Sequence, residues 1–331
     1  MIYENVPQPE PRAGEVLVQV RAVGICGSEL SGYLGQNSLR VPPLIMGHEF
    51  AGKVVSLGND VEALYIGDEV AVNPLVSCGR CTMCARGLEN LCLERKIIGA
   101  HSPGAFADYV AVPAANCSVL PAGLTSVAGA LAEPLACGVR AVGLAGVTAG
   151  SQVVILGAGA IGLLAIATVQ AAGGKVILVA ELNPNRLAAA REWGARATAN
   201  AHDEDPAQMT RDLTGGLGAD VVIDAVGTST TRKTAIAALR PGGIAVFVGL
   251  HEPASMLPAN HIIRSEISVV GSFAYTKADF AAALELLVTG AVTPSDQWVE
   301  VRRLSACADS FEELIDGTPT CSKIILHPSP N

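Results

Sequence analysis

The sequence predicts an α/β protein that combines a doubly wound parallel sheet with a second, mostly-β domain. A glycine-rich turn joins two apolar strands within 153–180. Strand and helix patterns alternate from 151 to 271, as in a parallel sheet with crossover helices. Short strands separated by glycine turns fill residues 15–113, which is typical of an all-β domain. The chain has 331 residues, a length that suits about two domains.

The glycine-rich turn has the context of a dinucleotide site. Gly157, Gly159 and Gly162 stand in G-x-G-x-x-G spacing after the strand at 153–156, and the next strand ends at Glu181. The first glycine permits the tight turn, the second lets the backbone approach a pyrophosphate, and the third lets helix and strand pack closely. The following helix offers free N–H groups to the phosphates. This strand–turn–helix–strand unit predicts a Rossmann domain.

Glu181 favours NAD over NADP. Its carboxylate can accept hydrogen bonds from both ribose hydroxyls and would repel a 2′-phosphate. Strand C-termini face the cofactor in such sheets, so we expect further contacts from the helix start and from the ends of later elements. These expected contacts are Ala160, Ile161, Arg186, Val226, Val248 and Gly249.

Apolar periodicity and turn residues predict the remaining elements. Residues 24–35 form a turn-rich segment, and 125–145 form helix with a boundary or a kink at Glu133, which precedes Pro134. The tail supplies a helix and a final strand at 323–326. In the parallel-sheet region we expect strands near 153–156, 176–180, 196–199, 220–224, 244–248 and 267–270, and helices near 160–172, 185–193, 206–213, 229–239 and 277–289.

Composition limits the kinds of partner. Half of the residues are hydrophobic and only 16% are charged, so a large core is available, and the net charge is −9. The sequence contains no basic run, which argues against nucleic acid or an anionic membrane as a partner. It shows no bilayer-spanning apolar segment and no signal peptide. We therefore expect a cytoplasmic protein.

Four cysteines form a compact candidate metal site. Cys78, Cys81, Cys84 and Cys92 follow the spacing C-x-x-C-x-x-C-x7-C. Four thiolates on a short loop can close tetrahedrally around zinc and leave no open position. An iron–sulfur cluster and unliganded thiols are the alternatives. Clustering of four among nine cysteines indicates metal binding in a reducing compartment rather than disulfides.

A second candidate metal centre combines Cys26, His48 and Glu49. Taken alone, a single cysteine is usually buried packing, and a single histidine is usually structural. Here the cysteine lies on one turn, two residues before Ser28, and the other two residues lie together on another turn. One thiolate, one imidazole and one carboxylate make a zinc site that keeps a position open for water or substrate.

These motifs together resemble the zinc-dependent medium-chain alcohol dehydrogenases over nearly the whole chain. The resemblance includes the cysteine loop, the glycine turn, Cys-Gly-Ser at 26–28, Gly-His-Glu-Phe-Ala-Gly at 47–52, Gly-Asp-Glu-Val at 67–70 and Leu-Ala-Glu-Pro-Leu at 131–135. The last motif carries Glu133 where the short-alcohol branch usually has a cysteine. The pattern is therefore most similar to the polyol, sorbitol and threonine dehydrogenases.

The resemblance implies two zinc ions per chain, a structural one and a catalytic one. The catalytic zinc would be held by Cys26, His48 and a glutamate. Both Glu49 and Glu133 qualify, because relatives differ in which of them binds the metal directly; a helix N-terminal acid is the plainer interpretation of Glu133. Zinc would act as a Lewis acid on the substrate hydroxyl, and NAD would accept the hydride.

The proton pathway departs from the family pattern. Ser28 is placed to accept the proton of the alcohol, although a turn serine that caps a backbone N–H is the alternative. Relatives usually have an aspartate where this chain has Glu29, and many have a histidine where it has Ser31. The exit of the proton to solvent is therefore open, and a ribose hydroxyl or a water are candidates for it.

The resemblance also implies the domain arrangement and the reaction. We expect a GroES-like catalytic domain at 1–130 and 272–331, an NAD-binding Rossmann domain at 131–271, and a homodimer or homotetramer. Relatives usually have a further strand before the one at 15–22, so an edge of the catalytic domain should be exposed or covered by a partner. The expected reaction is hydride transfer between NAD and a secondary alcohol of a polyol, sugar alcohol or cyclitol, which yields the ketone. A threonine-type amino-alcohol dehydrogenase and a catalytically inactive dinucleotide-binding protein with a structural zinc are the alternatives.

Overall fold

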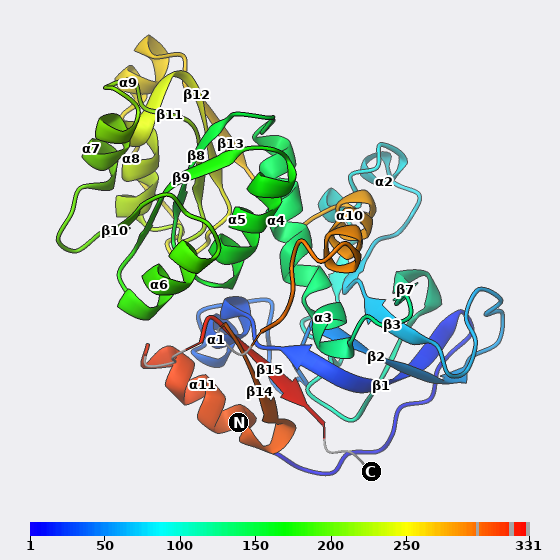
Figure 1. Cartoon of the computed structure of the whole chain (residues 1–331). Helices are drawn as coiled ribbons and strands as arrows, with labels where there is room; N and C mark the ends of the chain where they lie inside the picture. Colours follow the sequence, from blue (N-terminus) through cyan, green and yellow to red (C-terminus); the bar gives the residue numbers. More distant parts are fainter. Residues whose placement is uncertain (296–297, 318–320, 329–331) are drawn as a thin grey trace. The chain divides into compact units, whose positions relative to one another are not determined.

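The computed structural model divides the chain into two compact units (Figure 1). Unit 1 comprises Met1–Glu133 and Thr276–Asn331, and unit 2 comprises Pro134–Tyr275. Across the part of the chain that the structure describes, no helix is long and apolar enough to cross a membrane. The described residues are 1–295, 298–317 and 321–328.

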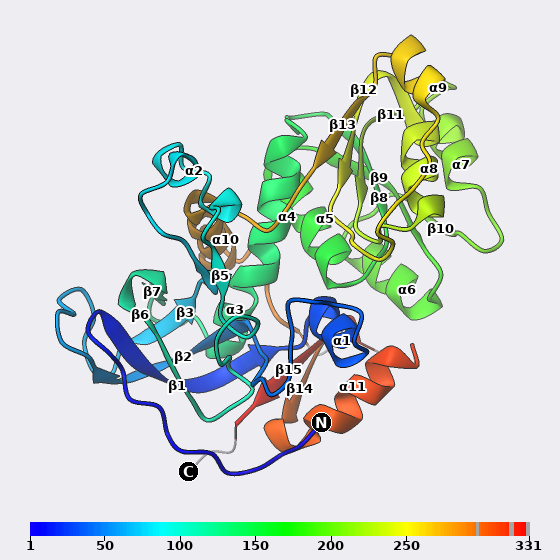
Figure 2. The same ribbon diagram turned by 180° about the vertical axis from the view of Figure 1, so that it is seen from behind.

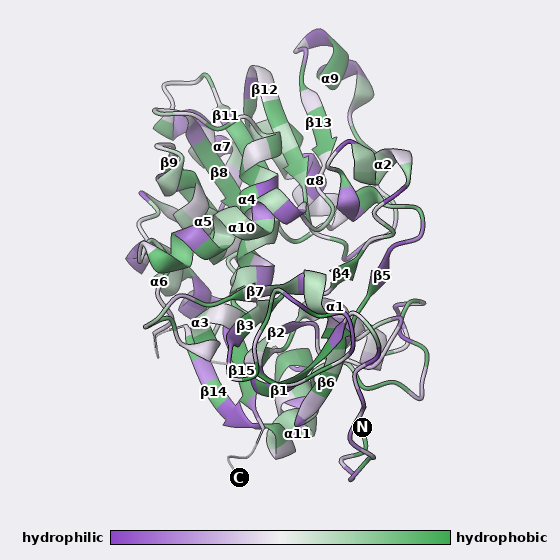
Figure 3. Ribbon diagram, turned by 90° about the vertical axis from the view of Figure 1, so that its right-hand side faces the viewer, coloured by the Kyte–Doolittle hydropathy of each residue, from purple (hydrophilic) through white to green (hydrophobic). Residues whose placement is uncertain are grey.

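Unit 2 is built around a six-stranded sheet in which all neighbouring strands are parallel. Its strands are β8 (Gln152–Leu156), β9 (Lys175–Glu181), β10 (Thr198–Asn200), β11 (Ala219–Asp224), β12 (Leu239–Phe247) and β13 (Ser268–Gly271). The order along the sheet is β10-β9-β8-β11-β12-β13, so the chain starts in the middle and winds outward in both directions. Most of β8, β9 and β11 is buried, and these strands are coloured as hydrophobic in Figure 3.

Helices cover both faces of this sheet, which confirms the predicted doubly wound architecture. They are α5 (Ala160–Ala171), α6 (Pro184–Glu192), α7 (Pro206–Leu213), α8 (Ser229–Ala238) and α9 (Ala259–Arg264), and α4 (Ala132–Leu144) runs from unit 1 into unit 2. On one face, Val154 packs in a cluster with Ala207 of α7 and Ile236 of α8. On the other face, Ile155 lies next to α5, 3.6 Å from the position of a Cβ on Gly162.

Two features of unit 2 differ from the sequence prediction. Strand β12 begins at Leu239, earlier than the expected start at 244, because Leu239 already pairs with Ala219 ahead of a register shift. Helix α9 was not predicted. It is one short segment that follows Pro258 and buries none of its residues, so no apolar periodicity marks it.

Unit 1 contains a seven-stranded sheet that gathers strands from both ends of the chain. Its strands are β1 (Glu15–Gly24), β2 (Glu49–Leu57), β3 (Glu69–Val72), β6 (Tyr109–Pro113), β7 (Cys117–Val119), β14 (Val299–Arg303) and β15 (Lys323–His327). The order is β14-β15-β1-β2-β3-β7, with β6 paired to β1, and Figure 2 shows β15 and β14 beside β1. Gly24 pairs with Glu49 on one side and with Ile325 on the other. Three distant segments therefore meet just before Cys26.

The other elements of unit 1 are short, apart from α10. They are α1 (Gly27–Tyr33), α2 (Thr82–Ala85), α3 (Ser126–Ala130), α10 (Lys277–Val288), α11 (Cys307–Ile315), the two-stranded antiparallel sheet of β4 (Leu75–Val76) and β5 (Lys96–Ile97), and the 3-10 turns η1 (Glu89–Leu91), η2 (Ala114–Asn116) and η3 (Leu304–Ala306). The core between them packs Val18 and Phe50 of the sheet against Phe311 of α11.

Three features of unit 1 differ from the sequence prediction. The segment at 24–35 forms helix α1, because the Glu29 carboxylate caps its start by accepting from the Cys26 N–H at 3.0 Å. The helical region at 125–145 breaks at Leu131, so Glu133 lies inside the first turn of α4. Strand β14 was not predicted, because three of its five residues are charged.

Candidate active site

The four cysteines of the loop at 78–92 lie together in unit 1. Their sulfur atoms fall within 4.8 Å of one another. Cys84 Sγ lies 3.6 Å from Cys81 Sγ and 4.0 Å from Cys78 Sγ. Four sulfurs around a zinc ion with bonds of about 2.3 Å would be about 3.8 Å apart. The loop therefore fits a closed, tetrahedral zinc site, and all nine cysteines of the chain are free thiols.

One thiol of this loop ionises readily. A hydrogen bond from the backbone N–H of Cys84, with others from the loop, lowers the pKa of Cys81 to about 6. Burial and the neighbouring Cys81 raise the pKa of Cys84 to about 11. The loop thus offers one ready thiolate at neutral pH, and a bound cation would favour ionisation of the others.

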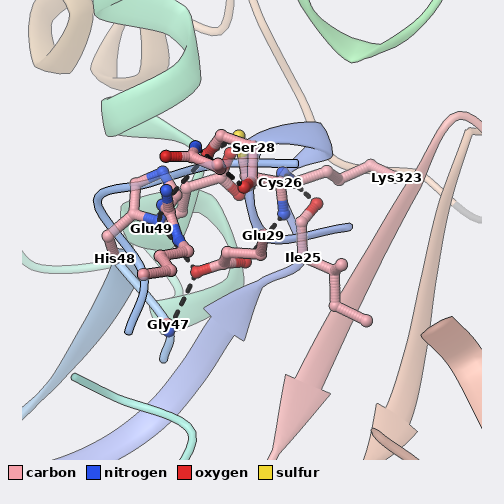
Figure 4. A network of polar contacts seen from close by, with 10 residues as sticks. Ile25, Cys26, Ser28, Glu29, Gly47, His48, Glu49 and Lys323 are labelled. Carbon is pink, nitrogen blue, oxygen red and sulfur yellow. Dashed lines mark hydrogen bonds and ion pairs between the residues drawn. The ribbon is translucent and has the colours of Figure 1, made fainter. Parts of the chain in front are cut away.

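Cys26, His48 and Glu49 converge at a second point in unit 1. Cys26 is the N-cap of α1, His48 directly precedes β2, and Glu49 is the first residue of that strand. Their ligand atoms lie within 4.8 Å of one another, and Figure 4 draws their side chains with the polar network around them. Among the described residues, no further histidine, cysteine or acid joins this group. Three ligands of three kinds fit a zinc ion that keeps a position open.

Glu29 orients the histidine. Its carboxylate is completely buried, and Oε1 accepts hydrogen bonds of 2.8 Å from His48 Nδ1 and from the Gly47 backbone N–H (Figure 4). Oε2 accepts from the Cys26 backbone N–H at 3.0 Å. Because Nδ1 carries the donated hydrogen, the lone pair of Nε2 is available to a metal ion.

The electrostatics of Glu29 and His48 favour a positive charge at the histidine. Burial raises the pKa of Glu29, but the charge of His48 and its hydrogen bond outweigh burial, so the pKa lies below its ordinary value. Burial lowers the pKa of His48, but the negative charges of Glu29 and Cys26 outweigh it and hold the pKa well above its ordinary value. The site is therefore poised to hold a positive charge at Nε2, as a proton or as a metal ion.

Ser28 lies between Cys26 and Arg40. Its hydroxyl donates to the sulfur of Cys26 at 3.3 Å, and its oxygen accepts from the Arg40 guanidinium at 3.0 Å. The predicted proton acceptor is therefore beside the predicted metal ligand. Ser31, which stands where many relatives have a histidine, instead donates to the carbonyl oxygen of Gly27 at 3.2 Å within its own helix.

Lys323 brings a buried cation from the last strand to Glu49. Its ammonium group donates to a carboxylate oxygen of Glu49 and to the Ile25 carbonyl oxygen, the latter at 2.9 Å. The two side chains are 2% and 1% exposed. Burial lowers the pKa of Lys323, but the charge of Glu49 outweighs it and raises the pKa. A Cβ on Gly24 would overlap both side chains, so only glycine leaves room for this pair.

Glu133 does not join the ligand group. It is 8% exposed in the first turn of α4. Within the described residues, the second group of ligand atoms within 4.8 Å of one another consists of Cys26, His48 and Glu49 and does not include Glu133.

The predicted cofactor turn of unit 2 lies between β8 and α5. Gly157 has φ of +93°, a region that favours glycine, and a Cβ on Gly162 would overlap the Gly157 carbonyl oxygen. A Cβ on Gly159 would meet no atom within 4 Å. Open space therefore faces the start of α5, where Ala160 and Ile161 form the first turn. This geometry fits a pyrophosphate at a helix N-terminus.

The end of β9 adds polar groups to this turn. Glu181 accepts from the backbone N–H of Ala158 at 2.9 Å, and from those of Leu182 and Asn183 at 2.7 and 3.1 Å. Its carboxylate is thereby tied to the glycine turn. In α6, Nε of Arg186 is buried and has no hydrogen-bond partner among the described residues. A fixed carboxylate and an unused buried donor on the elements that flank the turn fit a polar ligand.

The ends of β11 and β12 bring the remaining predicted cofactor contacts together. Val248 and Gly249 donate their backbone N–H groups to the Asp224 carbonyl oxygen at 2.9 and 3.0 Å. The Asp224 carboxylate in turn accepts from the N–H groups of Val226 and Gly227 at 2.9 and 3.0 Å. Burial raises the pKa of this carboxyl group. The two loops are thus tied to one buried residue at the C-terminal edge of the sheet, one through the Asp224 carbonyl oxygen and the other through its carboxylate.

Known protein families match residues in both units of the chain. Residues 12–122 match the family described as Alcohol dehydrogenase GroES-like domain, and residues 160–289 match the family described as Zinc-binding dehydrogenase. Sorbitol dehydrogenase of Bacillus subtilis (strain 168) is 33% identical over 333 residues, which cover 98% of this chain and 94% of that protein. The chain belongs to the zinc-dependent alcohol dehydrogenase family.

Other relatives of this alcohol dehydrogenase also align with nearly the whole chain. L-galactonate-5-dehydrogenase of Escherichia coli (strain K12) is 34% identical over 97% of this chain and 96% of that protein. The crystal structure of an alcohol dehydrogenase from E. coli CFT073, complexed with NADH, aligns with a TM-score of 0.89 and 29% identity. That alignment covers 96% of this chain and 93% of the other.

Sequence reasoning assigned no role to three charged residues that surround the candidate zinc site of this alcohol dehydrogenase. Glu29 was visible only as a departure from the family aspartate. Lys323 opens an otherwise apolar strand, which is a signal for a buried charge, but its partner depends on β15 pairing with β1 across the whole chain. Arg40 stands alone before two prolines, and no local pattern indicates that it folds back onto Ser28.

Proposed function

We propose that this chain is a zinc- and NAD-dependent dehydrogenase that interconverts a secondary alcohol of a polyol, sugar alcohol or cyclitol and the corresponding ketone. The observation that carries the proposal is the convergence of Cys26, His48 and Glu49, with Ser28 beside the sulfur. Relatives named for sorbitol and L-galactonate support a polyhydroxylated substrate.

The proposed roles follow from the contacts of each side chain. Cys26, His48 and Glu49 hold the catalytic zinc, whose chemistry is to polarise the substrate hydroxyl as a Lewis acid. Glu29 keeps the histidine in the orientation that presents Nε2. Ser28 would accept the proton of the hydroxyl and release its own proton to a ribose hydroxyl or to a water. Glu133 remains the alternative carboxylate ligand that the family pattern allows, although Glu49 is favoured by its distance to the other two.

We further propose NAD as the hydride acceptor and a second, structural zinc. Glu181 would take the ribose hydroxyls, and Gly157, Gly159, Gly162, Ala160 and Ile161 would surround the pyrophosphate. Arg186, Val226, Val248 and Gly249 complete the proposed contacts. The relative solved with NADH supports this choice of cofactor. The second zinc would be held by the four cysteines of the loop at 78–92.

We also propose roles for the two units, an oligomeric state and a cellular location. Unit 1 is the proposed catalytic domain and unit 2 the proposed NAD-binding domain. Strand β13 has one unpaired edge among the described residues, and Val269 on it is 40% exposed. We expect a homodimer or homotetramer that uses this edge, which light scattering during gel filtration tests. Nine free thiols, four of them grouped as a metal site, favour a cytoplasmic location.

The direct test is oxidation of a substrate panel by the purified, zinc-loaded protein. The panel contains polyols, cyclitols, simple secondary alcohols and threonine, each with NAD and with NADP, and NADH or NADPH formation is followed by absorbance. We expect turnover of a polyol or cyclitol with NAD. Turnover of threonine alone would support the amino-alcohol alternative. Binding of NAD without turnover of any alcohol would support an inactive dinucleotide-binding protein.

A further inference from the structure

Arg40 is a buried cation that forms no ion pair, because the nearby Glu29 carboxylate bonds instead to His48 and to the backbone N–H groups of Gly47 and Cys26. The residue is 7% exposed, and among the residues that the structure describes no carboxylate lies within 4.0 Å of its guanidinium. Its Nε is buried and has no hydrogen-bond partner in that same part of the chain. A buried guanidinium with unused N–H groups is costly unless a ligand supplies acceptors for them.

Only one acceptor of the described chain reaches this guanidinium. The Ser28 hydroxyl oxygen accepts from it at 3.0 Å. His48 Nδ1 lies 3.4 Å away, but that nitrogen carries the hydrogen that it donates to Glu29, so two donors face each other there. The remaining N–H groups of the fork therefore have no acceptor within the described residues.

The guanidinium is held in place by the surrounding chain. The Arg40 backbone N–H donates to the Asn37 carbonyl oxygen at 3.2 Å, and the Asn37 side-chain amide donates to the Ser28 carbonyl oxygen at 3.4 Å. The aliphatic stem crosses α1 at Gly32, where a Cβ would lie 2.5 Å from Arg40 Cδ. The absence of a side chain at Gly32 thus lets the stem lie close to the helix.

The position of this cation links it to the proposed reaction. Arg40 contacts the Ser28 hydroxyl, which lies 3.3 Å from the Cys26 sulfur. A substrate whose hydroxyl is held next to Ser28 would bring its other oxygen atoms toward Arg40. Lys323, the other buried cation of the site, is already paired with Glu49. One free guanidinium matches one carboxylate in charge and in planar geometry, whereas a dianionic phosphate would leave a charge uncompensated.

We propose that Arg40 binds the carboxylate of the substrate, so that this enzyme prefers a polyhydroxy acid to the corresponding neutral polyol. This inference rests on the proposed function and narrows its substrate class. Arg40 is then a residue that determines specificity, and it also fixes the Ser28 hydroxyl.

The test compares substrates that differ only at one terminal carbon. Sorbitol is paired with gluconate and galactitol with galactonate, and a phosphorylated alditol forms a third arm, all with zinc-loaded protein and NAD. We expect kcat/KM to be at least about tenfold higher for one of the two aldonates than for its alditol, because a charge-assisted hydrogen bond is lost with the neutral compound. Calorimetric titration with the same aldonates gives a readout that does not require turnover.

Variants at Arg40 then test whether this residue causes the preference for aldonates. Arg40→Met should reduce the aldonate-to-alditol ratio of kcat/KM by about 10- to 100-fold, mainly through KM of the aldonate, and should weaken the calorimetric signal. The ratio is the readout because loss of the contact to Ser28 lowers turnover of both compounds alike. Arg40→Lys should restore part of the ratio. Arg12→Met, which removes an exposed guanidinium of the same unit, should leave it unchanged.

The possible outcomes separate this inference from the proposed function. Oxidation of alditols without preference for the aldonates, or with preference for the phosphorylated alditol, overturns the inference and leaves the function standing. An unchanged ratio in Arg40→Met also overturns the inference. Failure of both aldonates and all other alcohols to be oxidised overturns the proposed function and this inference together. If Arg40→Met does not fold, a wild-type ratio near one still overturns the inference, and the reduced ratio expected for Arg40→Lys still tests the role of Arg40.

Discussion

Nδ1 of His48 donates a 2.8 Å hydrogen bond to the completely buried carboxylate of Glu29. The same carboxylate also holds the backbone N–H groups of Gly47 and Cys26. One side chain thus fixes both turns that carry the predicted zinc ligands. The longer side chain of glutamate, where relatives have aspartate, is accommodated by helix α1, whose start it caps.

Replacement of Glu29 by glutamine tests this bridging role. The amide keeps an acceptor but removes the charge that stabilises a cation at His48. We expect kcat/KM or zinc affinity to fall by about 10- to 100-fold. Zinc retention during dialysis against a chelator measures the effect without turnover. Glu62→Gln, an exposed glutamate of the same unit, is the control, and equal zinc retention in the two variants would contradict the role of Glu29.

The buried pair of Lys323 and Glu49 gives a prediction for stability. In the zinc-free protein, Lys323→Met leaves the Glu49 carboxylate buried without a cation, which should lower the free energy of unfolding by about 3–5 kcal/mol. Urea titration followed by circular dichroism measures the change. Lys53→Met changes a half-buried lysine of strand β2, which also carries Glu49, and should cost much less. Similar losses in both variants would mean that the ion pair has no special importance.

Glu181 gives a prediction for cofactor choice. Glu181→Gln keeps acceptors for the backbone N–H groups of the turn but removes the negative charge that opposes a 2′-phosphate. We expect the ratio of kcat/KM with NAD to that with NADP to fall by about tenfold. Glu192→Ala, at the exposed end of α6, should not change it. A wild-type enzyme that used NADP as well as NAD would contradict the role given to Glu181.

Asp220 gives a prediction for the pH dependence of stability. Burial raises the pKa of Asp220, but hydrogen bonds from the Gln152 N–H and from Arg240, both 2.7 Å, outweigh it and hold the pKa below its ordinary 3.8. Stability from a lowered carboxyl pKa is fully present above the unfolded value and is lost as pH falls through the folded value.

The free energy of unfolding of the wild type should therefore exceed that of Asp220→Asn by about 1 kcal/mol near neutral pH. This advantage should disappear as pH falls below about 3.8. Unfolding curves collected from about pH 6 to about pH 3 test the window. A difference between the two proteins that stayed constant over this range would show that Asp220 does not act through its charge.

Much of unit 2 could be predicted because its elements are encoded locally. The strand at 153–156 is a continuous apolar run, and the glycine spacing fixes the turn that follows it. Helix α9 was not predicted, because a short exposed helix has no buried face that would give its sequence a hydrophobic periodicity. The start of β12 at Leu239 depends on pairing with Ala219, which is a tertiary contact.

The candidate site likewise combines residues that a local pattern predicts with residues that depend on tertiary contacts. Cys26, His48 and Glu49 were found because a metal needs specific ligand types, and these types stand out in a sequence. Arg40 and Lys323 act on the site through folding of distant segments. The apolar strand of Lys323 signals a buried charge, but the partner of neither residue can be predicted from its neighbours in the chain. The second carboxylate, Glu133, was suggested by the family pattern and not by any distance.

Metal analysis of the purified protein tests the central claim most directly. We predict about two zinc ions per chain in the wild type and about one in Cys26→Ser, with loss of alcohol oxidation, because the cysteine loop keeps its own ion. Cys117→Ser, a half-buried thiol of the same unit outside both clusters, should retain both ions and full turnover. An unchanged zinc content and full turnover in Cys26→Ser would contradict the account.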